Sequence, residues 1–260
     1  WVLDFEIRSI LNEFQTTSDS EIKLTLSKLF QNPGRQVLFL FLFLCLSGAM
    51  IIAGVQKGVE RWNRILMPSL FIVLLGLFFY STTLPGFFKA LTFLFSFDVE
   101  SLSGSAILDA MGLAFFTLSV GCGVMLTYGS YLSRSAYLPS VTIPVVFVDT
   151  VIALLFGVVI FSTVFSFDAV EVSVGPTLIF QTLPLLFSKM YGGYYIAILF
   201  FMLVVFAALT STISVYEVVI SFVEETYSMN RRKSTILIGV GAFFLGLLSA
   251  FSSNILSHIT

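Results

Sequence analysis

One carboxylate stands out among the residues that could do chemistry. Asp149 lies inside the long apolar run Val141–Phe165, with no basic residue near it in the sequence. In a helix that crosses a bilayer, an ionisable side chain costs about 2.5–3.5 kcal/mol on insertion scales, so it is expected to face a cavity, an ion or a polar partner. The alternative is a protonated carboxyl group hydrogen-bonded inside a helix bundle. Asp109 and Glu217 lie nearer the ends of their apolar runs, and we expect them to be solvated or interfacial.

Hydroxyl groups and glycines cluster in a second apolar run. The segment Phe115–Gly123, FFTLSVGCG, places two hydroxyls and two glycines where a lipid-facing helix would favour leucine. A helix can break there, and the freed carbonyls and hydroxyls could then coordinate a cation or a substrate near the bilayer midplane. Close helix packing through small residues explains the same composition equally well, because Ser and Thr also bond back to their own helix. Both interpretations stay open.

A similar stripe occurs later in the chain. Ala207, Thr210, Ser211 and Ser214 follow the spacing that places residues on one helix face. Hard cations such as sodium or calcium prefer oxygen ligands, so two adjacent hydroxyls and a backbone carbonyl would make a partial cation site. Packing alone explains this stripe as well.

Glycines and prolines mark two further segments. Gly58 and Pro68 flank a basic loop, and proline lacks an amide donor, so the helix that starts there could unwind as a cytoplasmic gate. The segment Val174–Met190 is interrupted at Pro176 and Pro184. It is too broken to span a membrane and too apolar for an ordinary loop, so we expect a re-entrant lid near 173–190 on the outer face.

Composition sets the class of protein that must position these groups. Of 260 residues, 57% are hydrophobic and only 11% are charged, as in a membrane protein. The net charge of -2 and the absence of a charge block give no reason to expect nucleic acid. Cys45, Cys122 and His258 lack metal-ligand spacing. An aspartyl protease needs two facing carboxylates, and only Asp149 is deep, so we do not expect an enzyme.

Six stretches are long enough to cross a hydrocarbon core of roughly 30 Å. Because backbone groups cannot remain unpaired in lipid, each should be a helix, giving an all-α, multi-pass membrane protein. Residues 1–35 precede them as the end of a helix and a loop with a short amphipathic helix. The start at Trp1 predicts a fragment of a longer protein. The expected spans are 36–55, 65–84, 107–128, 141–165, 194–222 and 234–251.

Loop charge predicts the orientation of these spans. The connections after the first, third and fifth spans carry most of the lysines and arginines, including Lys57, Arg61 and Arg232, so they are expected in the cytoplasm. The other connections should lie outside.

Five segments carry a family resemblance. They are FFTLSVGCG at 115–123, AALTSTIS at 207–214, GVERWNRILMP at 58–68, VDTVIALLFG at 148–157 and GPTLIFQTLPLLFSKM at 175–190. Together they resemble the prokaryotic branch of the neurotransmitter:sodium symporters. The resemblance covers nearly the whole chain and implies transmembrane helices four to nine of an inverted-repeat transporter with discontinuous helices. It further implies sodium-coupled symport of a neutral amino acid, or a related amine, by alternating access across the bacterial plasma membrane.

The same resemblance implies roles for individual residues. Thr117 and Asp149 match the first sodium site, with Asp149 in place of an asparagine found in many members. Ala207, Thr210 and Ser211 match the second sodium site. Gly58 and Pro68 match the glycine and proline of the inner gate. Substrate-binding positions are matched by Phe116, Thr117, Ser119, Cys122, Ser211 and Val215.

Departures from the family pattern concern chloride. Ala153 and Leu113 stand where chloride-dependent relatives carry polar residues. We therefore expect Asp149 to supply the negative charge and chloride not to be required, with sodium as the coupling ion. The expected partners are an amino-acid substrate and membrane lipid, and a homodimer stays open. The alternatives are a proton-coupled or sodium-independent carrier of the same architecture and a member that binds substrate without transporting it.

Overall fold

The computed structural model describes residues 1–54, 60–96, 103–133, 135, 137–166 and 175–252. In these ranges the regular structure is helical. Five of the described helices are long and apolar enough to cross a membrane. They are α4 (Pro33–Ile52), α5 (Glu60–Ser81), α9 (Leu138–Phe165), α11 (Gly193–Tyr227) and α12 (Arg231–Ser252).

Local sequence sets the ends of α4. The Asn32 side chain accepts a hydrogen bond from the backbone amide of Arg35 at 3.0 Å, and Pro33 occupies the first helical turn. At the other end, Gly54 has φ +90°, a conformation that glycine adopts without steric cost. The twenty apolar-rich residues between these signals are enough to span a hydrocarbon core.

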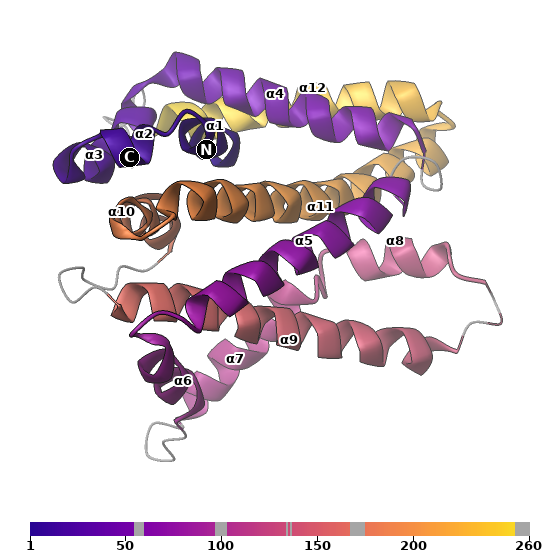
Figure 1. Ribbon diagram of the computed structural model, residues 1–260. Coiled ribbons are helices and arrows are strands. Elements are labelled where there is room, and N and C mark those ends of the chain that lie inside the picture. Colours follow the sequence, from indigo (N-terminus) through magenta and orange to yellow (C-terminus); the bar gives the residue numbers. More distant parts are fainter. Residues whose placement is uncertain (55–59, 97–102, 134, 136, 167–174, 253–260) are drawn as a thin grey trace.

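The long helices lie in layers around α11. The helices α4 and α12 pack against each other on one side of α11, while α5 contacts α11 on another side and α9 packs against α5 (Figure 1). The short helix α6 (Phe87–Phe95) packs along α9. Thirteen of the 35 residues of α11 are buried, as expected for the helix that the others surround.

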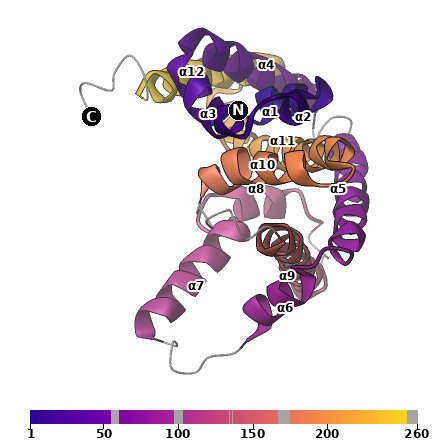
Figure 2. The same ribbon diagram turned by 60° about the vertical axis from the view of Figure 1, so that its left-hand side comes forward.

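Short helices cover one end of this bundle. They are α1 (Val2–Ile10), α2 (Glu13–Thr16), α3 (Asp19–Gln31), the π-helix η2 (Leu178–Thr182) and α10 (Leu183–Lys189). The segment expected as a lid is thus a π-helical turn followed by α10, and Leu183, Leu186 and Phe187 are almost fully buried within it. Its position over the first residues of α11 is visible in Figure 2.

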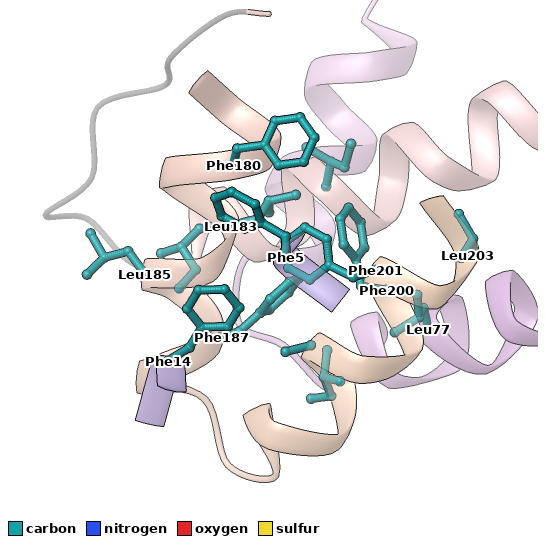
Figure 3. Close-up of a cluster of buried hydrophobic side chains, with 14 of the residues drawn as sticks. Phe5, Phe14, Leu77, Phe180, Leu183, Leu185, Phe187, Phe200, Phe201 and Leu203 are labelled. Atoms are coloured by element: carbon teal, nitrogen blue, oxygen red, sulfur yellow. The ribbon is translucent and has the colours of Figure 1, made fainter. Parts of the chain in front are cut away.

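Aromatic rings join these short helices to α11. Figure 3 shows Phe5 of α1 among rings from α2, η2 and α11. The ring centroid of Phe5 lies 4.9 Å from that of Phe180 and 5.5 Å from that of Phe201. Aromatic pairs at such distances contribute about 0.5–1.5 kcal/mol beyond the area they bury. The cluster therefore fixes segments that are nearly 200 residues apart.

A buried ion network lies beside the aromatic cluster. The Asp4 carboxylate is fully buried and accepts from Arg8 Nε at 2.7 Å and from Arg35 Nε. Arg8 also pairs with Glu13 through Nη1 at 2.5 Å. Burial of a carboxylate is costly unless it is paired and hydrogen-bonded, so these contacts hold α1 against the start of α4.

Candidate functional site

The third expected span is a broken helix. The helix α7 covers Gly104–Thr117, α8 covers Val124–Ser130, and the six residues 118–123 between them are not helical. Neither piece alone is long enough to cross a hydrocarbon core. Figure 1 shows that the chain changes direction between the two pieces. A discontinuous helix, one of the two interpretations of the hydroxyls and glycines, is therefore present.

Left-handed backbone conformations produce the break. Ser119, Gly121 and Gly123 have φ values of +54°, +89° and +78°. Residues with positive φ cannot continue a right-handed α-helix. At the end of α7, the carbonyls of Ala114, Phe115 and Phe116 accept hydrogen bonds from backbone amides of residues 118–120, whereas no side chain caps the first amides of α8. Such carbonyls and amides are the groups that bind ions and small polar ligands in discontinuous membrane helices.

The two halves of this helix are held differently. A Cβ atom on Gly123 would lie 3.0 Å from Val218 Cγ1, so α8 starts in close contact with α11. The Tyr128 hydroxyl donates to Ser214 Oγ at 3.0 Å and fixes the middle of α8 to the same helix. In α7, by contrast, none of the described residues is buried. The break thus joins an anchored half to an exposed half.

The hydroxyl face of α11 lies opposite α8. Thr210 is buried, and its hydroxyl is within donor distance of the carbonyls of Phe206 and Ala207, at 3.1 and 3.0 Å. Ser214 donates to the Thr210 carbonyl and accepts from Tyr128. Ser211 is exposed on this helix. Of these hydroxyl residues, Ser214 contacts the anchored half of the broken helix, whereas Ser211 lines a cavity with residues of α1, α4 and α12.

Asp149 lies in α9, five residues after the internal Pro144. Its side chain is half-buried, and no basic group of the described residues lies within ion-pair distance. Thr117, the other expected member of the first ion site, ends α7 and donates to the Ala114 carbonyl at 3.3 Å. No hydrogen bond joins the two within the described chain.

Most of the expected substrate-binding residues are exposed. Phe116 is 77% exposed and Val215 is 53% exposed. Cys122 is exposed as well, whereas Ser119 is half-buried. Ser211 lines a cavity of about 480 Å³ together with residues of α1, α4 and α12.

Of the expected gate residues, Gly58 lies outside the described residues. Pro68 lies inside α5, which is helical from Glu60 onward and continues past the proline. The half-buried Ser69 beside it donates to the Ile65 carbonyl at 2.8 Å. In this conformation α5 is not unwound at Pro68.

The expectation of a solvated or interfacial Glu217 is wrong. Its carboxylate is fully buried and forms a bidentate pair with Arg231, with Nη2–Oε2 at 2.6 Å and Nη1–Oε1 at 3.1 Å. The Tyr131 hydroxyl, directly after α8, donates to Oε1 at 2.8 Å. Arg231 Nε also donates to the Ile51 carbonyl at the end of α4 at 2.9 Å. Helix–helix packing buries the carboxylate because these donors satisfy it.

A metal ion could be bound by a cluster of acidic, thiol or imidazole side chains. In the described part of the chain, no three His, Cys, Asp or Glu residues are grouped so that they could hold a metal ion. An ion at this position would have to be held mainly by hydroxyl and carbonyl oxygens, which suit hard monovalent and divalent cations rather than zinc or copper.

A model described as the Sodium:neurotransmitter symporter family matches residues 11–257. The chain belongs to this family. Like other members of this transporter family, it is not an enzyme, and with five candidate spans it is part of a multi-pass integral membrane protein.

Relatives of this symporter chain include bacterial proteins. It is 36% identical to an uncharacterized sodium-dependent transporter of Haemophilus influenzae, over 88% of this chain and 50% of that protein. It is 32% identical to another from Bacillus subtilis, YhdH, over 100% of the chain and 57% of that protein. The crystal structure of MhsT in complex with L-phenylalanine matches with a TM-score of 0.88 and 34% identity, covering 100% of the chain and 59% of MhsT. The chain thus has the sodium symporter fold and spans about half the length of the curated relatives it matches.

Proposed function

We propose that the symporter to which this chain belongs carries a neutral amino acid, or a related amine, across the plasma membrane together with sodium. The observation that supports this most is the break at 118–123 beside the hydroxyl face of α11. In membrane transporters, substrate and ion sites are typically formed where a membrane-spanning helix is discontinuous.

The two ion sites are proposed from the same residues that the sequence indicated. Thr117 and Asp149 would contribute to the first sodium site, in which a carboxylate supplies charge to balance the ion. The Ala207 carbonyl and the Thr210 and Ser211 hydroxyls would contribute to the second site. Thr210 Oγ and the Ala207 carbonyl are already 3.0 Å apart, a separation that lets both oxygens face one cation after a small rotation of the hydroxyl.

Substrate would lie against the break. Phe116, Thr117, Ser119 and Cys122 come from the broken helix, and Ser211 and Val215 from α11. Their exposure fits a pocket whose remaining walls come from outside this chain, which spans about half of its relatives. The similar protein MhsT was crystallised in complex with L-phenylalanine, and this supports an amino acid as the substrate class here. We also propose Gly58 and Pro68 as inner-gate residues.

The Asp149 carboxylate bears on whether transport requires chloride. Asp149 carries a negative charge in the position where chloride-dependent relatives need an anion nearby, so we propose that chloride is not required. A protonated Asp149 would instead fit proton coupling, since the described residues offer it no basic partner.

Uptake into proteoliposomes that contain the full-length protein separates these possibilities. Labelled neutral amino acids are supplied with an inward sodium gradient, a proton gradient or neither, for wild type, Asp149→Ala and the exposed-site control Asp109→Ala. Uptake that needs sodium and fails in Asp149→Ala, but not in the control, is the expected result. Uptake driven by protons alone would replace the sodium proposal, and binding without uptake would show a non-transporting member.

A further inference from the structure

An apolar groove unrelated to the substrate site runs between α4 and α12. It has a volume of about 340 Å³, within the range of about 300–1,000 Å³ that is usual for small-molecule pockets. Phe41, Cys45 and Ile52 of α4 form one wall, and Gly239 and Phe243 of α12 form the other. Tyr216 of α11 also lines the groove.

Small residues create the groove. A Cβ atom added to Gly239 would meet no atom within 4 Å, so open space faces this glycine. Gly48 and Ala49 lie on the opposite wall. The rings of Phe41 and Phe243, with centroids 5.9 Å apart, meet at the other end of the lining stretch of α4 from Ile52. The groove is therefore a slot with small residues along its walls and an aromatic pair at one end.

The walls of the groove belong to two helices that can span a membrane. Only 28% of the spanning window of α4 and 11% of that of α12 are buried. The sides of such helices that protein leaves uncovered have lipid as their solvent. An apolar slot continuous with that surface is filled most favourably by hydrocarbon, because water gains no hydrogen bonds there.

The length of the slot matches one leaflet. From Phe41 to Ile52 the axis of α4 advances about 16 Å at about 1.5 Å per residue. Half of a hydrocarbon core of roughly 30 Å is about 15 Å. The slot also reaches the end of α4, where the surface of the bilayer is expected. A single acyl chain of the adjoining leaflet would run along it from end to end.

Tyr216 adds a polar contact to the apolar lining. Its hydroxyl oxygen is buried and, within the described chain, has no hydrogen-bond partner. A buried hydroxyl without a partner costs about 1–3 kcal/mol by mutational measures, so such groups usually meet a partner. Tyr216 packs on the cluster of Met50 and Ile51, which places it toward the Ile52 end of the slot. The ester oxygens of a glycerolipid lie at that level of a bilayer.

We propose that this groove binds one acyl chain of a membrane phospholipid, with the Tyr216 hydroxyl donating to an ester oxygen of the same lipid. The site is separate from the residues assigned to sodium and amino acid, and the proposal does not depend on the substrate.

Photo-crosslinking in bilayers tests the proposal. The full-length protein is reconstituted in phosphatidylethanolamine and phosphatidylglycerol, with a small fraction of phosphatidylglycerol that carries a diazirine in one acyl chain. Adducts are mapped by peptide mass spectrometry after illumination. We expect adducts on residues 41–52 and 236–243, reduced at least fivefold by Gly239→Leu, which fills the slot.

Gly241→Leu is the matched control. Gly241 lies on the same helix and also has no atom within 4 Å of an added Cβ atom, but it does not line the groove. Ala49→Phe fills the slot from the opposite wall and replaces Gly239→Leu if that variant does not fold. Adduct yields that are equal in the filled variants and the control would overturn the proposal. Crosslinks from the groove to another segment or to a second copy, in place of lipid, would overturn it too.

Discussion

The pair between Glu217 and Arg231 allows a sharp test of how the helices are held together. We consider Arg231→Met, which keeps much of the length of the side chain and removes its charge and its donors. The Glu217 carboxylate is fully buried and, among the described residues, would retain only Tyr131 and Ser221 as donors, at 2.8 and 3.3 Å. The Ile51 carbonyl would lose its bond from Arg231 as well.

The magnitude follows from the burial of the remaining charge. Breaking a buried ion pair by removing one partner typically costs about 3–5 kcal/mol, because an uncompensated charge is left behind. For chains of this size, 1 kcal/mol corresponds to about 2–4 °C in melting temperature, so a loss of about 6–20 °C is expected. The lower part of this range is expected for the full-length protein, which is longer.

Thermal unfolding of the full-length protein in detergent, followed by intrinsic fluorescence, measures this loss. Arg232→Met is the matched control, because Arg232 is the next residue and its side chain is exposed. The double variant Glu217→Leu with Arg231→Met should recover much of the stability, since it leaves no buried charge. Equal melting temperatures for the two single arginine variants, or a double variant no better than Arg231→Met, would refute the reasoning.

The break, the lid and the ion site each lead to a further prediction. Gly123→Ala should lower the free energy of unfolding by about 1–3 kcal/mol, because Gly123 has φ +78° and lies in contact with α11. Gly129→Ala is the control and should not lower it in the same unfolding assay, because open space surrounds Gly129. Gly193→Ala places a Cβ atom 1.8 Å from the Phe187 carbonyl oxygen, so gel filtration should show loss of folded protein, unlike Gly76→Ala. Replacing chloride with gluconate should leave sodium-driven uptake unchanged, and abolished uptake would contradict the proposed role of the aspartate.

Sequence pattern was sufficient where the physical signal is local. Runs of apolar residues define the helices that can span the membrane. The glycines and hydroxyls at 115–123 allow a break as one of two interpretations, and the structure has this break. The backbone conformation of residues 118–123 is harder to predict from the sequence, because Ser119 has a positive φ, which serine rarely adopts. The ends of the helices were also harder to predict from the sequence. The apolar pattern of α11 fades near Phe222, but the backbone remains helical to Tyr227 because exposed Glu225 needs no apolar surroundings.

Contacts between distant segments were not predictable from the pattern. The burial of Glu217 depends on Arg231, Tyr131 and the end of α4, and periodicity along one helix says nothing about donors on others. Arg231 is the first of three consecutive basic residues, but this run of charge does not indicate which acidic residue it would pair with. The buried Asp4 was missed for the same reason, because Arg35 lies 31 residues away.

The aromatic cluster around Phe5 has a consequence for biosynthesis. The ring of Phe5 packs against the ring of Phe201, which is synthesised much later. A ribosome that adds about 5–20 residues per second needs roughly 10–40 s to make the chain between them. During that interval the aromatic face of α1 cannot pack against α11. This apolar face can then bind other exposed apolar segments instead. The membrane-insertion machinery, or the lipid itself, must shelter this segment until α11 emerges. Substitutions in Phe5 should therefore lower the yield of inserted protein more than the activity of the molecules that fold.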